Sequence, residues 1–371
     1  MRVAVDATSL LDTRTGVGRF TEALLTGLGQ RDDVTVTAFP VSLRGRARLH
    51  DVVPDGVDVV APPLPAAVLR QAWLRTSFPR IDTFVGHHDL IHGPNFVVPP
   101  ARAARLMTVH DLTPVRFPEL CNRHTLDYPR LISRAAGAGA WVHTDSDAVR
   151  DEVIAELGVD AGRVVTVPLG FQSKAGGDPE AGRALAGRDD YVLTVGTVEP
   201  RKDLPSLVRA VDQLAAAGME LPLVHVGPDG WGAEQLAQTL HEVDRPDLLH
   251  RLGFKTDREL RDLYAGARLV AYPSVYEGFG FPVLEAMSAG APVVATRVPA
   301  VAEVAGDAAE LVPVGDVETL ADGLRRVWTD DERRRQLIER GRVRTEAFSW
   351  SRCIDGMVEL YRRVIADAER V

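Results

Sequence analysis

The chain has 371 residues, of which 45% are apolar and 26% charged, so it is long enough for two hydrophobic cores and has the composition of an ordinary globular protein. It contains no uncharged apolar run of about 18 residues and opens without the basic and apolar regions of a signal peptide, so neither a membrane span nor secretion is expected. The net charge of −9 argues against nucleic acid as the main partner. Cys121 and Cys353 lack metal-type spacing, which favours a reduced, cytoplasmic protein without a structural disulfide.

The first half of the chain alternates short apolar runs with segments of helical periodicity. This βα rhythm favours a parallel sheet with helices on both faces. A strand over 2–8 precedes a glycine turn and a helix, and the periodicity of 123–136 and 147–157 predicts two more helices. The other strands expected in this half cover 34–41, 88–93, 104–111, 140–146 and 163–170.

The segment 171–190 breaks this rhythm, because it is rich in Gly, Ala and charged residues and lacks strand-forming side chains. We expect it to be an interdomain linker. The rhythm then restarts, and the chain ends in a charge-rich helical stretch over 317–371. This pattern predicts an α/β protein of two doubly wound, Rossmann-like domains with parallel sheets and an interdomain cleft, in which ligands bind at the carboxyl ends of the strands. The six strands expected after the linker cover 191–198, 222–228, 248–254, 268–274, 292–298 and 309–314.

A glycine turn within 12–22 is the first candidate site. Gly16 and Gly18 would let backbone N–H groups approach an anion closely, and the helix N-terminus that follows favours negative charge. Arg19 would add a positive charge. The pattern is not a full G-x-G-x-x-G, so a nicotinamide site is not favoured. The alternative is that both glycines serve only the tight turn.

A basic pair after the first strand of the second half is the second candidate. Arg201 and Lys202 precede a helix whose start is indicated by Asp203 and Pro205. A guanidinium and an ammonium beside the positive end of a helix form a pyrophosphate-binding arrangement. The alternative is a solvated loop pair, although lysine is scarce in this chain, with only three residues among 43 basic ones.

The stretch "SVYEGFGFPVLEAMSAGAPVVAT" (274–296) is the third candidate. Glu277 is expected in a loop at the carboxyl end of a strand, and Glu285 about one turn into the next helix. Gly278 and Gly280 would let the loop backbone pass close to a ligand. Carboxylates accept hydrogen bonds from vicinal hydroxyls, so a sugar and a ribose suit this pair. The alternative is two solvated helix-side charges.

Histidines form the fourth candidate. His110 and Asp111 end a strand, where a histidine could orient a hydroxyl or share a proton. The alternative is a hydrogen-bonded core histidine. His87, His88 and His92 cluster in sequence, but no second cluster completes a metal site, so none is expected.

Two further stretches have ordinary explanations. The "DSD" of 143–153 is similar to a metal-binding D-x-D, but its place before a helix favours an N-cap. The stretch 44–80 could touch an anionic membrane or acceptor, although a solvated surface is the simpler interpretation. Its basic and aromatic residues are Arg44, Arg46, Arg48, Arg70, Trp73, Arg75, Phe78 and Arg80.

Together these motifs resemble glycosyltransferase family 4, whose members have the GT-B fold. The resemblance spans essentially the whole chain in the right order. The E-x(7)-E spacing of Glu277 and Glu285 is its most specific element, and the glycine turn alone would be weak. The other stretches that carry it are "TGVGRF", "VHDLTPVRFPE", "GTVEPRKDL" and "GF…DREL".

The resemblance implies a role for each matched residue. Glu277 would bind hydroxyls of the donor sugar, and His110 would lie beside that sugar near the acceptor. Arg201 and Lys202 would hold the diphosphate and complete the catalytic set, and Glu285 would bind the ribose. The remaining donor contacts implied are Gly16, Val17 and Gly18 at the phosphates, Phe254 and Lys255 at the base, and Gly278, Phe279 and Gly280 at the sugar.

The resemblance also implies a domain plan. Residues 1–170 would form a Rossmann-like acceptor-binding domain, and 191–350 a Rossmann-like nucleotide-sugar-binding domain. Residues 171–190 would link them, and 351–371 would form a C-terminal helix that crosses back to the first domain.

The implied activity is a retaining, metal-independent transfer of a hexose from a nucleotide-diphosphate sugar to a hydroxyl of a glycan, a lipid-linked sugar or a small molecule. The donor is a co-substrate, and no cofactor is required. The first half is most similar to bacterial mannosyl- and rhamnosyltransferases, which favours GDP-mannose. A cytoplasmic location is expected, with peripheral contact to the inner face of the membrane as a further expectation. Two alternatives stay open: a nucleotide-sugar 2-epimerase of similar fold, and a non-catalytic sugar-nucleotide-binding homologue.

Overall fold

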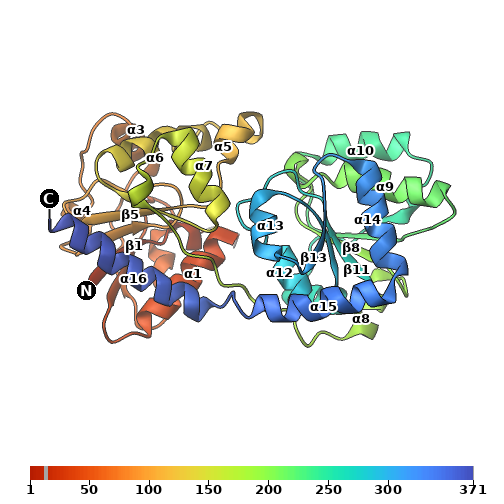
Figure 1. The fold of residues 1–371 in the computed structure, drawn as a ribbon. Helices are drawn as coiled ribbons and strands as arrows, with labels where there is room; N and C mark the ends of the chain where they lie inside the picture. Colours follow the sequence, from red (N-terminus) through yellow and green to blue (C-terminus); the bar gives the residue numbers. More distant parts are fainter. Residues whose placement is uncertain (12–15, 371) are drawn as a thin grey trace. The chain divides into compact units, whose positions relative to one another are not determined.

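A computed structural model of the protein describes residues 1–11 and 16–370. The chain divides into two compact units, one formed by Met1–Gly170 together with Phe348–Val371 and the other by Phe171–Ala347. Each unit is a sheet with helices packed against it (Figure 1). None of the described helices is long and apolar enough to cross a membrane.

The first unit is built on a parallel sheet whose strand pairs all run in the same direction. Its inner strands are buried on both faces, which explains why they read as continuous apolar runs. In spatial order, the seven described strands are β3 (Asp58–Val59), β2 (Thr35–Phe39), β1 (Arg2–Asp6), β4 (Leu90–Gly93), β5 (Ala104–Val109), β6 (Trp141–Thr144) and β7 (Val164–Thr166).

Helices cover this sheet, and the last helix of the chain is among them. α16 contacts α1 and also β4 and β5 (Figure 1). Gly27 allows the close approach to α1, because a Cβ there would lie 2.5 Å from Cγ1 of Ile354. The α-helices described in this unit are α1 (Gly16–Gly29), α2 (Leu49–Val52), α3 (Ala66–Trp73), α4 (Asp82–Val85), α5 (Thr113–Arg116), α6 (Tyr128–Gly137), α7 (Asp147–Leu157) and α16 (Trp350–Ala368).

A buried hydrogen-bond chain ties α16 to the sheet. The hydroxyl of Tyr361 lies 2.8 Å from Nδ1 of His92, whose Nε2 lies 2.8 Å from Oγ1 of Thr108. That oxygen lies 2.9 Å from Nδ1 of His143, whose Nε2 lies 2.9 Å from the carbonyl oxygen of Val167. The carbonyl can only accept, so with neutral rings every bond points one way, from Tyr361 toward Val167. Burial lowers the pKa of both histidines, which favours their neutral forms.

The second unit is also built on an all-parallel sheet. Successive residues of its strands face opposite cores, as the twofold side-chain period requires: Val192 packs in one apolar cluster and Leu193 in the other. Both predicted doubly wound sheets are therefore confirmed. The six described strands, in spatial order, are β10 (Leu249–Arg251), β9 (Leu223–Val226), β8 (Val192–Val195), β11 (Leu269–Tyr272), β12 (Val293–Thr296) and β13 (Ala309–Val312).

The helices of this unit include one that the sequence did not predict. α8 lies inside 171–190, the segment expected to be a linker, and the whole of that segment belongs to the second unit. The helices of the unit are α8 (Pro179–Ala186), α9 (Leu204–Ala216), α10 (Ala233–Glu242), α11 (Asp257–Gly266), α12 (Phe281–Ser288), α13 (Pro299–Ala305), α14 (Val317–Thr329) and α15 (Asp331–Thr345).

The glycines of 171–190 explain the correction. A Cβ on Gly177 would clash with the carbonyl of Arg261, and a Cβ on Gly182 would clash with the carbonyl of Asp262. Both carbonyls belong to α11, so the glycines let α8 pack directly on that helix. The composition that suggested an interdomain linker instead serves a close backbone contact.

Two smaller differences concern short elements of the first unit. β3 has two residues and was not predicted, because so short a strand has no measurable periodicity. The helix expected over 123–136 begins at Tyr128, after a single 3₁₀ turn over Thr125–Asp127. The helix over 147–157 was predicted with its observed bounds.

Candidate functional site

The candidate site of the second unit lies where its strand order reverses. β8 and β11 are paired, and the later strands run outward from them on opposite sides. Doubly wound sheets bind ligands at the carboxyl ends of the strands at such a point. The chain leaving β8 carries Arg201 and Lys202, and the chain leaving β11 carries Glu277, so both motifs meet there.

The loop after β8 is held by its own helix cap. A 3₁₀ turn, Pro200–Lys202, leads into α9, whose N-cap Asp203 accepts a hydrogen bond from the backbone N–H of Ser206 at 3.3 Å. This confirms the predicted helix start. Asp203 has a φ of 46°, a left-handed conformation that is uncommon outside glycine and that turns the chain sharply into the helix. The backbone N–H of Val275 donates to the carbonyl of Arg201 at 2.8 Å, which joins this loop to the one after β11.

Glu277 lies between the two cations. Nη1 of Arg201 donates to its Oε2 at 2.9 Å, and Nζ of Lys202 donates to its Oε1 at 2.5 Å. The same ammonium donates to the hydroxyl of Tyr272 at 2.8 Å. With 8% of its side chain exposed, Glu277 is fixed by charge-assisted bonds on both oxygens.

The pKa of Glu277 reflects this arrangement. Burial alone would raise the pKa of the carboxyl group, but the charges of Lys202 and Arg201 and the hydrogen bonds to the group outweigh it and lower the pKa to about 2. Glu277 is therefore ionised at neutral pH. An anionic carboxylate beside two cations can accept hydrogen bonds from hydroxyl groups and cannot donate a proton.

The loop that follows leads into a buried carboxylate. Gly280 has a φ of 112° and stands at the N-cap of α12, so the backbone turns there in a way that suits glycine. Gly278 and Phe279 are buried beside it. Glu285, the fifth residue of α12, is buried, and its Oε2 accepts a hydrogen bond from the hydroxyl of Tyr264 at 3.1 Å.

The residues expected near a nucleotide base also lie at the carboxyl end of a strand of this sheet, after β10. The loop after β10 contains Gly253, whose φ is 66°, and its carbonyl accepts a hydrogen bond from the backbone N–H of Gly227, after β9. Phe254 has 80% of its surface exposed, and Lys255 is half-buried beside it. A large apolar ring on a fixed loop is available for stacking.

The glycine turn of the first unit is only partly described, because 12–15 lie outside the described residues. α1 begins at Gly16, which is exposed, and Val17 is half-buried behind it. Gly18 is buried, and a Cβ there would lie 3.3 Å from the carbonyl oxygen of Ser9, so its small size suits this contact. The turn follows β1, which pairs with β4 where the strand order of the first sheet reverses.

His110 follows β5 and is bonded at both ring nitrogens. Nδ1 lies 2.7 Å from Oδ2 of Asp145, and Nε2 lies 2.8 Å from the carbonyl oxygen of Pro94. A carbonyl and an ionised carboxylate can only accept, so this pair of partners favours a proton on each ring nitrogen. Burial alone would lower the pKa of His110, but the charge and hydrogen bond of Asp145 outweigh burial and raise it.

The "DSD" stretch serves as a cap, as predicted. Ser146 is the N-cap of α7 and accepts a hydrogen bond from the backbone N–H of Val149 at 3.3 Å, while the preceding Asp145 supports His110. Within residues 1–11 and 16–370, no group of three or more His, Cys, Asp or Glu side chains is placed to hold a metal ion.

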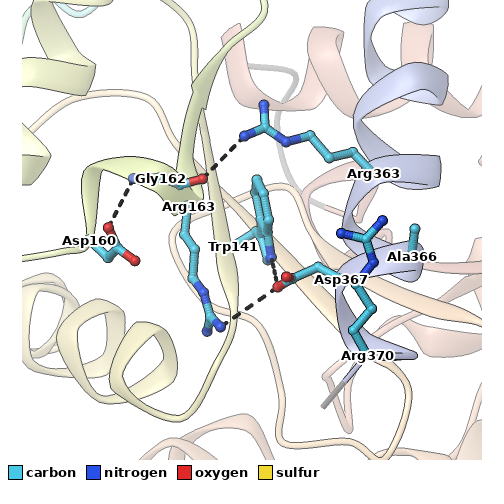
Figure 2. A pocket seen from close by; sticks show the side chains of 8 residues that line it. All are labelled: Trp141, Asp160, Gly162, Arg163, Arg363, Ala366, Asp367 and Arg370. Atoms are coloured by element: carbon cyan, nitrogen blue, oxygen red, sulfur yellow. Dashed lines mark hydrogen bonds and ion pairs between the residues drawn. The ribbon is translucent and has the colours of Figure 1, made fainter.

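A hollow of about 470 Å³ lies at the amino ends of the strands of the first sheet, where β6 begins (Figure 2). Its polar groups bind one another. Asp367 of α16 accepts a hydrogen bond from the indole N–H of Trp141 at 3.0 Å and pairs with Arg163 at 3.6 Å. The guanidinium of Arg363 lies 4.7 Å from the centre of the Trp141 ring. These contacts hold α16 against β6 at the amino ends of the strands, whereas His110 and the glycine turn of the same unit follow the carboxyl ends of β5 and β1.

Three supporting residues of these sites were not found from the sequence, and a fourth, Asp145, was noted only as part of the "DSD" stretch. Tyr264 and Lys174 contact Glu285, Tyr272 accepts a hydrogen bond from Lys202, and Asp145 supports His110. Three of them lie on a strand, on a helix and in an irregular segment, with no spacing that links them to the motifs. The scarcity of lysine was the one available signal for Lys174.

Two family models and several known proteins match this chain. A model described as Glycosyltransferase Family 4 matches residues 14–173, and one described as Glycosyl transferases group 1 matches residues 180–344. The O-antigen chain mannosyltransferase B of Escherichia coli is 32% identical over 301 residues, which cover 79% of this chain and 77% of that protein. The chain belongs to glycosyltransferase family 4.

This glycosyltransferase is also similar to the MMP alpha-(1->4)-mannosyltransferase of Mycolicibacterium hassiacum, with 33% identity over 229 residues. The match covers 60% of this chain and 54% of that relative.

Solved structures show the same fold across the whole chain. Sucrose-phosphate synthase from Thermosynechococcus elongatus superposes with a TM-score of 0.75 at 20% identity, covering 99% of both chains. WaaG, a glycosyltransferase involved in lipopolysaccharide biosynthesis, gives 0.74 at 17% identity, covering 97% of this chain and 99% of its own. At such identities the likeness concerns the fold, and it confirms the predicted GT-B architecture.

Proposed function

We propose that this glycosyltransferase moves a hexose, with GDP-mannose favoured as the donor, to a hydroxyl group of a glycan, a lipid-linked sugar or a small molecule. The observation that carries the proposal is the pair of cations fixed on Glu277 at the switch point of the second sheet. The mannosyltransferase names of two relatives support the choice of sugar. HepE of Anabaena, which shares the fold at 20% identity and a TM-score of 0.70, has been solved with UDP and glucose, in keeping with a nucleotide-sugar donor.

The chemistry asks for charge stabilisation at the leaving group. Breaking the bond between the sugar and the diphosphate builds positive charge on the sugar and negative charge on the diphosphate. Arg201 and Lys202 would stabilise the diphosphate from positions that are already fixed, so little reorganisation is needed during the reaction. These two charges, with the N-terminus of α9 behind them, would do the work that a divalent metal does in other transferases. We therefore propose a metal-independent reaction.

The other matched residues would bind the rest of the donor. Glu277 and the backbone of Gly278, Phe279 and Gly280 would hold the sugar, because an ionised carboxylate accepts hydrogen bonds from its hydroxyls. Glu285 would bind the ribose, and Phe254 and Lys255 would lie at the base. Gly16, Val17 and Gly18 of the first unit would approach the phosphates. Both glutamates would position the donor, and a front-face displacement would retain the configuration of the sugar.

His110 is proposed to lie beside the sugar near the acceptor, with its ring held in one orientation. Because both of its nitrogens donate to protein acceptors, it is poorly suited to take a proton from the acceptor hydroxyl. Its charge is balanced by the carboxylate of Asp145, so the pair would orient the sugar without opposing the positive charge that develops on it. The oxygen of the departing phosphate is then the natural base for the acceptor proton.

The test is a donor screen with the purified protein in EDTA. UDP-, GDP-, ADP- and dTDP-sugars are offered with and without candidate acceptors, and products are followed by mass spectrometry and by NMR of the anomeric proton. Turnover of GDP-mannose, with an α-linked product, supports the proposal. Binding of only a UDP-sugar overturns the choice of mannose. Conversion of UDP-N-acetylglucosamine without an acceptor would identify an epimerase instead.

The donor-site assignment has its own test. Lys202→Ala should lower kcat with the best donor by a factor of 100 or more, on the order of the loss when one fixed transition-state donor is removed. Arg188→Ala, at an exposed residue of the same unit, serves as the control. Unchanged turnover in Lys202→Ala would show that the diphosphate is held elsewhere.

Peripheral membrane contact through 44–80 is a further part of the proposal. Phe78 has 72% of its surface exposed and Val68 has 65%, among several arginines. Trp73 takes no part, because it is buried and its indole N–H donates to the carbonyl of Pro79 at 3.1 Å. Co-sedimentation with vesicles containing anionic lipid, lost in Phe78→Ser, tests the contact.

A further inference from the structure

Lys174 is a buried lysine that none of the motifs explains. It lies in the first residues of the second unit, before α8, and its side chain has no exposed surface. An ammonium group in such a place is unfavourable unless opposite charges compensate it.

Two carboxylates flank this ammonium group. Nζ donates to Oδ1 of Asp257 at 3.0 Å, and it lies 3.9 Å from Oε1 of Glu285. Asp257 has 55% of its side chain exposed, whereas Glu285 has 6%. An exposed carboxylate keeps most of its hydration without a partner, so the buried Glu285 is the group whose charge depends on the lysine.

The backbone holds the lysine in register with α12. Its N–H donates to Oγ of Ser288 at 2.8 Å, and that hydroxyl donates to the carbonyl of Glu285 at 2.8 Å. Lys174 therefore approaches Glu285 both through its charge and through a hydrogen-bonded backbone contact. These contacts place the backbone of Lys174 next to the helix that carries Glu285.

The geometry around Glu285 distinguishes its two oxygens. Oε2 receives the hydrogen bond from Tyr264, while Oε1 faces Lys174 at a distance longer than a hydrogen bond. An ion pair at 3.9 Å stabilises the charge of the carboxylate without a direct bond from the ammonium. Lys174 thus favours the ionised group, and Tyr264 fixes its rotation.

We propose that Lys174 is a positioning residue for ribose recognition, which keeps Glu285 ionised and oriented toward the vicinal hydroxyls of the donor nucleotide. The inference rests on the proposed function, in which Glu285 binds the ribose. Tyr264 also supports Glu285, through its hydrogen bond to Oε2. If Lys174 only joined α11 to α12, its loss would lower the stability of the fold and would lower the affinity for all ligands alike.

The experiment compares nucleotides with and without ribose hydroxyls. Binding of GDP, UDP and their 2′,3′-dideoxy counterparts is measured by calorimetry in wild-type protein, Lys174→Met and the exposed control Arg188→Met. In Lys174→Met the affinity for the preferred ribonucleotide should fall by roughly tenfold, as for a weakened charge-assisted hydrogen bond, while the dideoxy affinity stays constant. The control should keep the wild-type ratio of the two affinities.

A double-mutant cycle with Glu285→Gln separates positioning from general damage. Once Glu285 has lost its charge, removal of Lys174 should cause little further loss of ribose discrimination. An equal fall in ribonucleotide and dideoxynucleotide affinity in Lys174→Met would overturn the inference.

Tyr264→Phe keeps the test decisive if Lys174→Met does not fold. It removes one hydroxyl from the same carboxylate and should also lower the ratio of ribonucleotide to dideoxynucleotide affinity. An unchanged ratio in Tyr264→Phe would then count against the support that we assign to Glu285. Wild-type protein that binds no nucleoside diphosphate would overturn the proposed function, whereas wild-type protein that binds the ribo and dideoxy forms equally would overturn this inference and the assignment of Glu285 to the ribose, but not the proposed sugar transfer.

Discussion

Nζ of Lys202 lies 2.5 Å from Oε1 of Glu277, although the two residues are 75 positions apart in the chain. The pair joins the two loops that leave β8 and β11, so the diphosphate-binding and sugar-binding motifs form one charged cluster. Each charge makes the burial of the other tolerable. A substitution at either residue will therefore alter the position of its partner as well as remove a contact.

The pH dependence of stability should reveal this cluster. Glu277 has a folded pKa of about 2 against a usual value of 4.5, so it contributes stability above pH 4.5 that is lost as the pH falls toward 2. The full contribution is on the order of 3 kcal/mol. In urea unfolding between pH 6 and pH 3, Glu277→Gln should lose less stability than the wild type. Parallel pH profiles for the two proteins would contradict the assigned ion pairs.

His110 should carry two ring protons at neutral pH. Its raised pKa means that its interaction with Asp145 contributes stability below the usual pKa of 6.5 and that this contribution is lost as the pH rises through the folded value. ¹⁵N NMR of the ring should show both nitrogens protonated at pH 7. Asp145→Asn should lower the pKa of His110, whereas Asp151→Asn, on the exposed side of α7, should not. A neutral ring at pH 6 in the wild type would be inconsistent with the bonding described.

The contact between α8 and α11 should not tolerate a methyl group. Gly182→Ala places a Cβ against the carbonyl of Asp262 and should lower the free energy of unfolding by about 1–3 kcal/mol, the usual cost of overpacking. Gly137→Ala is a matched control, because that glycine also lies in a helix but has open space around its Cβ position. It should be neutral or slightly stabilising. Equal effects of the two substitutions in thermal unfolding would show that α8 is not packed as described.

Removing one partner of the hydrogen bond between Tyr361 and His92 should destabilise the protein more than removing both partners together. Tyr361→Phe leaves Nδ1 of a buried histidine without its donor and should cost about 1–3 kcal/mol. The double substitution of Tyr361→Phe with His92→Phe should lower the free energy of unfolding by less than the sum of the two single substitutions. Strict additivity in denaturant unfolding would mean that the two side chains do not interact.

The sequence predicted the sheets because the strands are buried on both faces and read as apolar runs. The site motifs were found for a related reason, since loops at the carboxyl ends of strands carry their chemistry in short stretches, as at 196–203 and 274–285. Composition misled at 171–190, where glycine marks a close contact between helices rather than an interdomain linker.

The supporting residues could not be predicted in the same way. Lys174 and Tyr264 approach Glu285 from separate parts of the chain, 111 and 21 positions away, and no local spacing encodes that meeting. Likewise, the bonds of His110 to Asp145 and Pro94 depend on the pairing of neighbouring strands. Both ring nitrogens became assignable only once their acceptors were placed.

The bond between Tyr361 and His92 spans 269 residues, and this separation has a consequence for synthesis on the ribosome. All seven described strands of the first sheet have been made by Thr166, but α16, which packs against α1, β4 and β5, is made only after the whole of the second unit. The face that α16 covers must remain unprotected while the second unit is being made and folded. A nascent chain arrested before residue 350 should therefore bind chaperones through its first unit, whose second segment follows the whole of the second unit.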